Sequence, residues 1–167
     1  LKALNMGAAL VGPDTMAKLV QCLPGSRITT LKLGILEANV VALFSVLPKC
    51  AVTCLDLKWV ELSDASMQAL ADVISSTSVA ELDLAGNVMT DASLNKWSDA
   101  LPTSQVSRLS LCLSRTSEEA RLSFFFRLPE RPLSHLYLED VHLSAREVSA
   151  LAEDLNRMPL TSLHMYD

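Results

Sequence analysis

Apolar residues recur along this chain at two superimposed spacings, one short and one long. The short spacing is a pair of apolar residues separated by one position, found at Leu4/Met6, Leu31/Leu33, Leu55/Leu57, Leu82/Leu84, Leu109/Leu111, Leu136/Leu138 and Leu163/Met165. The long spacing is the interval between successive pairs, which is 27, 24, 27, 27, 27 and 27 residues. A third apolar residue stands three positions before each pair, at Leu1, Ile28, Val52, Val79, Val106, Leu133 and Leu160.

This regularity predicts seven structural units, each beginning with a strand. The chain is 50% hydrophobic, so apolar residues at all 21 of these positions would arise by chance roughly once in two million. Alternation with a period of two is typical of a strand with one buried face. A fixed repeat of this length is typical of stacked units, none of which can bury its core alone.

A helix is predicted after the strand, because the apolar spacing changes to three and four residues. Counted from the first residue of the pair, apolar residues return at +12, +15 and +19, as in Met16, Leu19 and Leu23, Met67, Leu70 and Ile74, Leu94, Trp97 and Leu101, and Val148, Leu151 and Leu155. Predicted helix starts and ends are N-caps at Ser63, Thr90 and Ser144 and prolines at Pro24, Pro48, Pro102 and Pro129. In the 24-residue interval, Val40 arrives three positions early, which predicts a shortened loop between Leu33 and Val40.

The segment Val79–Leu101 carries the whole pattern, with Leu82, Leu84, Asn87, Met89, Thr90 and Asp91 in place. It resembles the leucine-rich repeat superfamily, and its 27-residue unit is most similar to the ribonuclease-inhibitor-like class. The resemblance covers essentially the whole chain and implies an α/β solenoid, a horseshoe segment with a parallel sheet on the concave face and helices on the convex face. It departs at the +5 position, where the family usually has Asn or Cys and only Asn87 fits.

We expect residues 1–167 to form a single array of about seven strand-bearing units. Both ends present apolar strand residues with no polar capping unit beyond them. Because a stacked array needs polar caps to stay soluble, we expect this array to be part of a longer one.

Composition narrows the classes of partner. The net charge is -5, from 14 basic and 19 acidic residues without a basic block, which argues against nucleic acid and anionic membranes. No apolar run approaches the length of about 18 residues that a membrane span requires. The four cysteines have neither zinc nor redox spacing. Reduced thiols are therefore expected, and they favour a cytoplasmic setting.

Side chains beside the paired leucines are expected to point away from the core, onto the concave face. Acidic residues gather on the middle units, while aromatic and histidine side chains gather on the last two. Tyr and Arg are enriched at the energetically important positions of protein interfaces. The predicted binding residues are Asp56, Glu81, Asp83, Arg108, His135, Tyr137, Glu139, His164 and Tyr166.

Other uses of these residues are less favoured. His135, His164 and Glu139 could be drawn as a metal site, but side chains on flat strands rarely converge as metal ligands must. Asp56 and Asp83 could act as paired carboxylates, but an open, wet face shifts carboxylate pKa values little. No phosphate loop or catalytic triad pattern is present. We therefore expect no enzyme, no cofactor, no metal and no small-molecule substrate.

The sequence thus predicts a module that binds another protein on its concave face, and the acidic residues there suggest a partner with a basic surface. The alternative is a regulator of GTP hydrolysis similar to the Ran-type activators. Asn87 and Arg115 are the only loop side chains that are candidates for organising a GTPase site. A third reading is a structural spacer within a larger chain. In that case substitutions on the concave face would be silent.

Overall fold

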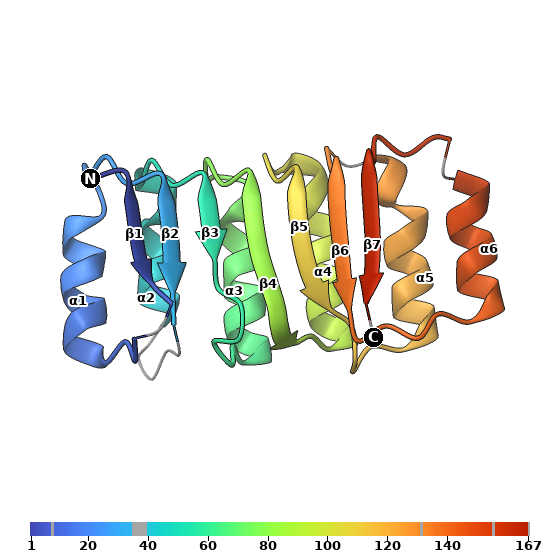
Figure 1. Ribbon diagram of the computed structural model, residues 1–167, viewed down its shortest axis with the longest axis horizontal. Coiled ribbons are helices and arrows are strands. Elements are labelled where there is room, and N and C mark those ends of the chain that lie inside the picture. The colour runs from blue at the N-terminus through green and yellow to red at the C-terminus, as the bar shows by residue number, and fades with distance from the viewer. Residues whose placement is uncertain (8, 35–39, 131, 155, 167) are drawn as a thin grey trace.

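Seven parallel strands, paired in chain order, form a single sheet in the part of the chain that the structure describes (Figure 1). The computed structural model describes residues 1–7, 9–34, 40–130, 132–154 and 156–166. The strands are β1 (Ala3–Met6), β2 (Thr30–Leu33), β3 (Cys54–Asp56), β4 (Glu81–Val88), β5 (Arg108–Cys112), β6 (His135–Glu139) and β7 (Ser162–Tyr166). The helices are α1 (Pro13–Cys22), α2 (Val40–Val46), α3 (Asp64–Ile74), α4 (Asp91–Ala100), α5 (Glu118–Phe126) and α6 (Ala145–Asp154).

The helices cover one face of the sheet (Figure 1). Each strand pairs with the next in parallel, and connections between parallel strands are almost always right-handed, which places successive helices on the same side. Each helix packs against its neighbours in the chain. We call the helix-free side of the sheet the open face. No helix among the described residues has the length and apolar character needed to cross a membrane.

The core lies between the sheet and the helices, as the leucine pairs predict. On β3 to β6 the paired leucines are at most 2% exposed: Leu55, Leu57, Leu82, Leu84, Leu109, Leu111, Leu136 and Leu138. The outermost strands, β1 and β7, have a neighbouring strand on one side only. There Met6 and Leu163 are half-buried, while Met165 is 48% exposed.

Helix positions and ends also follow the predictions in most units. Met67, Leu70, Leu94 and Trp97 are completely buried. The predicted caps are confirmed: the hydroxyl oxygens of Ser63, Thr90 and Ser144 accept backbone hydrogen bonds from Ser66, Ser93 and Glu147. Three predicted prolines lie in short 3₁₀ turns after α2, α4 and α5, at Leu47–Lys49, Leu101–Thr103 and Leu128–Glu130. The shortened loop falls on residues 35–39, which lie outside the described residues, as does Leu155.

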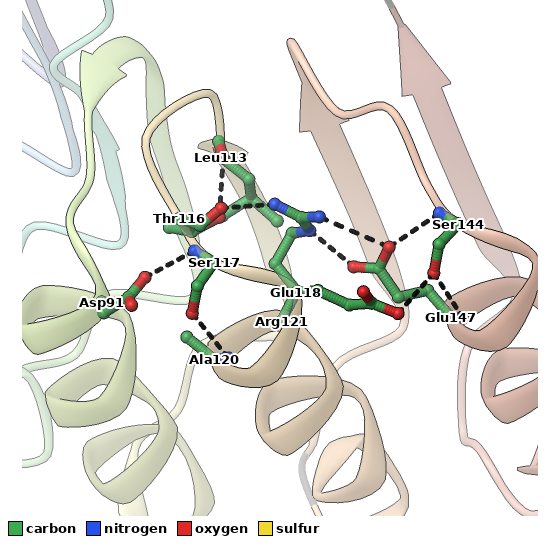
Figure 2. Close-up of polar contacts among 9 residues, drawn as sticks. All are labelled: Asp91, Leu113, Thr116, Ser117, Glu118, Ala120, Arg121, Ser144 and Glu147. Carbon is green, nitrogen blue, oxygen red and sulfur yellow. Dashed lines mark hydrogen bonds and ion pairs between the residues drawn. The ribbon is translucent and has the colours of Figure 1, made fainter.

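The prediction that Val148 is a core residue of α6 is wrong. Its side chain is 52% exposed, and the preceding residue, Glu147, is completely buried instead. The cause lies on α5, where Arg121 occupies the +12 position that is apolar in the units listed above. A buried guanidinium requires a counter-charge, and Glu147 supplies it across the seam between the two helices (Figure 2).

The contacts around this ion pair satisfy both side chains. Arg121 Nε donates to Glu147 Oε1 over 2.6 Å, and another guanidinium nitrogen donates to the carbonyl oxygen of Thr116. Glu147 also accepts a hydrogen bond from the backbone N–H of Ser144, while the hydroxyl of Ser144 accepts from the Glu147 N–H. This reciprocal arrangement is a capping box. Glu147 therefore begins α6 and joins it to α5 at the same time.

Ionised Glu147 is expected to stabilise the fold. Burial alone would raise the pKa of this carboxyl, but the hydrogen bonds from Arg121 and Ser144 outweigh burial and hold the pKa below its ordinary value of 4.5. Glu147→Gln leaves Arg121 without a counter-charge and should lower the free energy of unfolding by about 3 kcal/mol at pH 7. Because the folded pKa is depressed, this difference should persist above pH 4.5 and shrink at lower pH. Urea denaturation of the variant and the wild type, at pH 7 and at a pH below 4.5, measures this difference.

Two variants serve as controls for this prediction. Glu153→Gln removes an exposed carboxylate from the same helix and should change stability by less than about 0.5 kcal/mol. The double variant Arg121→Met, Glu147→Leu replaces the ion pair with apolar groups and should recover most of the loss. If the double variant were as unstable as Glu147→Gln, an unpaired charge could not be the cause.

Candidate functional site

The strand register aligns the residues of the open face into the predicted columns. One column runs Ala3, Thr30, Cys54, Glu81, Arg108, His135 and Ser162. The next runs Asn5, Lys32, Asp56, Asp83, Ser110, Tyr137 and His164. In the third column, Cys112, Glu139 and Tyr166 are paired directly. All nine predicted binding residues therefore lie on one continuous surface, although they come from five strands.

A hollow in the middle of the open face brings together five of these nine residues. We call it the central hollow; its volume is about 360 Å³, and it is lined by Cys54, Leu55, Asp56, Glu81, Leu82, Asp83, Arg108, Ser110 and Tyr137. The buried leucines form its floor, and the polar side chains surround them. Three carboxylates and one guanidinium line it, so its net charge is negative.

Aromatic rings form a flat ladder beside the central hollow. The rings of Tyr137 on β6 and His164 on β7 are stacked, with centroids 4.9 Å apart and planes 5° from parallel. Tyr166 continues the stack, 6.0 Å from His164 and 4° from parallel. His135 is not among the stacked rings; its Nδ1 lies 2.9 Å from the hydroxyl of Ser134. The ladder joins three of the predicted residues and leaves the Tyr166 ring 51% exposed.

Basic side chains pair with two of the three acidic residues that line the central hollow. Lys32 Nζ lies 2.6 Å from Asp56 Oδ2, and Arg108 lies 4.0 Å from Glu81. The hydrogen bond to Asp56 raises the pKa of Lys32, and the ammonium stays charged. Asp83 accepts a hydrogen bond from the Ala85 N–H. The alternation predicts where Asp56, Glu81 and Asp83 lie on the strands. It does not indicate that Lys32, which has a small and uncharged neighbour on β1, reaches across to Asp56.

Glu139 points along the sheet, and it links two strands that are not adjacent. Its Oε2 accepts a hydrogen bond from the N–H of Gly86 over 3.1 Å, which joins β6 to β4 across β5. Gly86 has a φ of 68°, a conformation that glycine adopts without strain. Cys112 lies between them on β5 and is 3% exposed. Burial raises the pKa of Glu139, and the nearby carboxylate of Asp83 adds to this effect, although the Gly86 N–H opposes it.

Trp59 is a candidate contact residue that the predicted set omits. Its side chain is 63% exposed, and its φ of 57° is rare for a bulky residue. The ring lies directly over Gly86, where a Cβ atom would come within 2.3 Å of it. The only sequence signal is a tryptophan immediately beyond a strand, and that signal does not reveal the left-handed backbone.

Asn87 has a structural role in the β3–β4 connection. Its amide nitrogen donates to the carbonyl oxygens of Leu57 and Leu84, and its Oδ1 accepts from the N–H of Leu62. The residue is completely buried. Its amide is consumed by these backbone contacts, so it offers no support for the alternative in which Asn87 organises a GTPase site. Arg115 remains exposed.

The cysteines and histidines form no recognisable reactive centre in the described residues. All four cysteines are free. Burial, followed by the negative charge of Glu81, raises the pKa of the Cys54 thiol in the central hollow, which makes it a poor nucleophile at neutral pH. Among the residues with described positions, no three His, Cys, Asp or Glu side chains converge as metal ligands would.

In comparisons with known proteins, no family model and no curated protein matches this chain.

Glu139→Gln should keep the hydrogen bond from Gly86 and remove the partly buried charge. A carboxyl with a raised folded pKa adds stability below its unfolded pKa of about 4.5, and that stability is lost as pH rises through the folded pKa. The variant lacks this loss, so its stability relative to the wild type should increase between pH 4 and pH 7. Urea midpoints of both proteins at the two pH values test this. A relative decrease would contradict it.

Asn87→Ala should destabilise the fold by about 2–4 kcal/mol, because it leaves several buried backbone groups without partners. Asn95 offers a matched control, since it is an exposed asparagine on α4, and Asn95→Ala should change stability by less than about 0.5 kcal/mol. Thermal and urea unfolding measure both. Equal effects in the two variants would show that the buried amide contacts contribute nothing.

Proposed function

We propose that this chain forms a leucine-rich-repeat solenoid and that it binds another protein on its open face. The aromatic ladder beside the central hollow is the observation that carries the proposal. Tyr137 belongs to both features, with its ring stacked on His164 and its side chain lining the hollow. Tyr is enriched among the residues that dominate interface binding energy, and such residues pack into pockets near the centre of an interface.

The open face also has the chemistry of a protein interface. It combines a hollow with an apolar floor, an aromatic surface and charged groups of both signs within a few strand spacings. Alternating charges favour a specific partner and orientation more than they increase affinity. The excess of carboxylates in the central hollow favours a partner that places a basic side chain there.

The proposed solenoid rests on the repeated strand–helix unit and on the role of Asn87. That asparagine stands at the +5 position of its unit and satisfies backbone groups of the preceding unit. The shared core explains why units of nearly constant length stack with their first leucines paired from strand to strand. In such a solenoid the open face would be concave, and a partner could contact many strands together.

Tyr137→Ala should weaken binding of the partner by roughly 30-fold or more, the effect of losing a dominant interface residue. A partner would first be identified by affinity capture with the wild-type protein and then titrated against purified variants. Phe126→Ala is the matched control, because Phe126 is a 55% exposed aromatic on α5, on the helix-covered side.

Two results would contradict the proposal. One is a partner whose affinity falls with Phe126→Ala and not with Tyr137→Ala, since binding would then involve the helices. The other is an unchanged affinity in Glu81→Lys, because reversing a charge in the central hollow must alter the binding of a basic partner. Circular dichroism of each variant verifies that it is folded.

A further inference from the structure

A second hollow lies on the open face, towards β1 and β2. We call it the lysine hollow; its volume is about 280 Å³, and it is lined by Gly7, Lys32, Leu33, Gly34, Lys58 and Trp59. No carboxylate is among these residues. The Lys32–Asp56 ion pair separates it from the central hollow, since Lys32 lines one hollow and Asp56 the other. The open face therefore has adjoining sites of opposite charge.

Lys58 gives the lysine hollow an available positive charge. Its side chain is exposed, and it forms no ion pair with a carboxylate in the described part of the chain. Its backbone is held in place, because the N–H of Lys58 donates to Asp56 Oδ1 over 3.2 Å. The ammonium group of Lys32 lines the same hollow, but the Asp56 carboxylate already partners it. An incoming carboxylate would therefore gain most from Lys58.

Small residues and one strained residue shape this hollow. Lys32 lies over Gly7, where a Cβ would come within 2.4 Å of its side chain, and a Cβ on Gly34 would meet the carbonyl oxygen of Ala9 at 2.2 Å. Trp59 stands at the rim in a left-handed conformation. Backbone strain of this kind is concentrated at functional sites. Here the strained residue presents a large ring to solvent beside two ammonium groups.

We propose that the lysine hollow binds an acidic peptide segment of a partner protein, with a carboxylate at Lys58 and an adjacent apolar side chain on the Trp59 ring. Charge complementarity selects the carboxylate, and the exposed ring selects a peptide over a simple anion. Nucleic acid fits less well, because its phosphates would also meet the three carboxylates of the central hollow. This inference rests on the proposed function, since it takes the open face to be the protein-binding surface.

The fluorescence of Trp59 gives a direct test. Trp97 is completely buried, so the fluorescence that acrylamide quenches comes mainly from Trp59. The probe is the peptide Gly-Glu-Leu-Glu-Gly with blocked ends, titrated at low ionic strength. Saturable protection of this fluorescence from quenching is expected. The affinity should fall with added salt, because the contact is electrostatic and close to solvent.

Lys58→Gln should weaken binding of this peptide roughly tenfold by removing a charge-assisted hydrogen bond. Lys49→Gln is the matched control, an exposed lysine in the turn after α2, and it should bind as the wild type does. The peptide Gly-Gln-Leu-Gln-Gly should bind far more weakly. Wild-type affinity in Lys58→Gln, equal binding of the glutamine peptide, or full competition by sodium phosphate would each overturn the proposal.

A basic peptide, Gly-Lys-Leu-Lys-Gly, separates failure of this inference from failure of the proposed function. If the acidic peptide does not bind while the basic peptide binds in a manner that Glu81→Lys abolishes, the lysine hollow is wrongly assigned and the proposed function stands. If neither peptide binds and the affinity of an identified partner is unchanged in Tyr137→Ala, the inference and the proposed function are both wrong. Binding of the acidic peptide that depends on Lys58 supports the inference.

Discussion

Burial of the leucine columns between the sheet and the helices is the interaction on which the structure depends. A single strand–helix unit has one sheet position and one helix, and both need neighbours to cover their apolar sides. The exposure of the paired residues shows this directly, because they are buried on β3 to β6 and partly exposed on β1 and β7. The register of the paired leucines follows from the same need, and the one shift among the described strand pairs comes after Asp83, between β4 and β5. A leucine on one strand must lie beside the leucine of the next strand, because each side chain covers part of its neighbour.

The regular part of the fold could be predicted because it repeats. Periodicity located the strands and most helix core positions, and with them the columns of the open face, since alternation along a strand assigns each side chain to a side. The prediction failed at Val148 because the pattern treats positions one at a time. Whether Glu147 or Val148 faces inward depends on Arg121, which is 26 residues earlier and one helix away. Pairwise compensation of this kind leaves no periodic signal.

The candidate site was predicted as a set of residues, but their interactions were not. Lys32 and Asp56 stand in one column, yet only side-chain conformations show that they pair and thereby divide the open face into a negative and a positive hollow. Trp59 depends on a left-handed backbone and on Gly86 beneath its ring. Neither condition can be recognised from a single sequence. The resulting surface has two polarities, so a partner that places a basic group in the central hollow and an acidic group in the lysine hollow would match both.

The hydrogen bond from Gly86 to Glu139 limits how freely the units can be exchanged. A repeat architecture suggests modules that could be deleted, duplicated or shuffled by recombination, because most contacts involve only adjacent units. Glu139 breaks that rule, since it spans β5 and requires a glycine two units earlier as well as a small residue at Cys112 between them. The three units that carry β4, β5 and β6 are therefore coupled physically and cannot be exchanged one at a time without losing this hydrogen bond. A graft of this surface onto another array would have to transfer all three together.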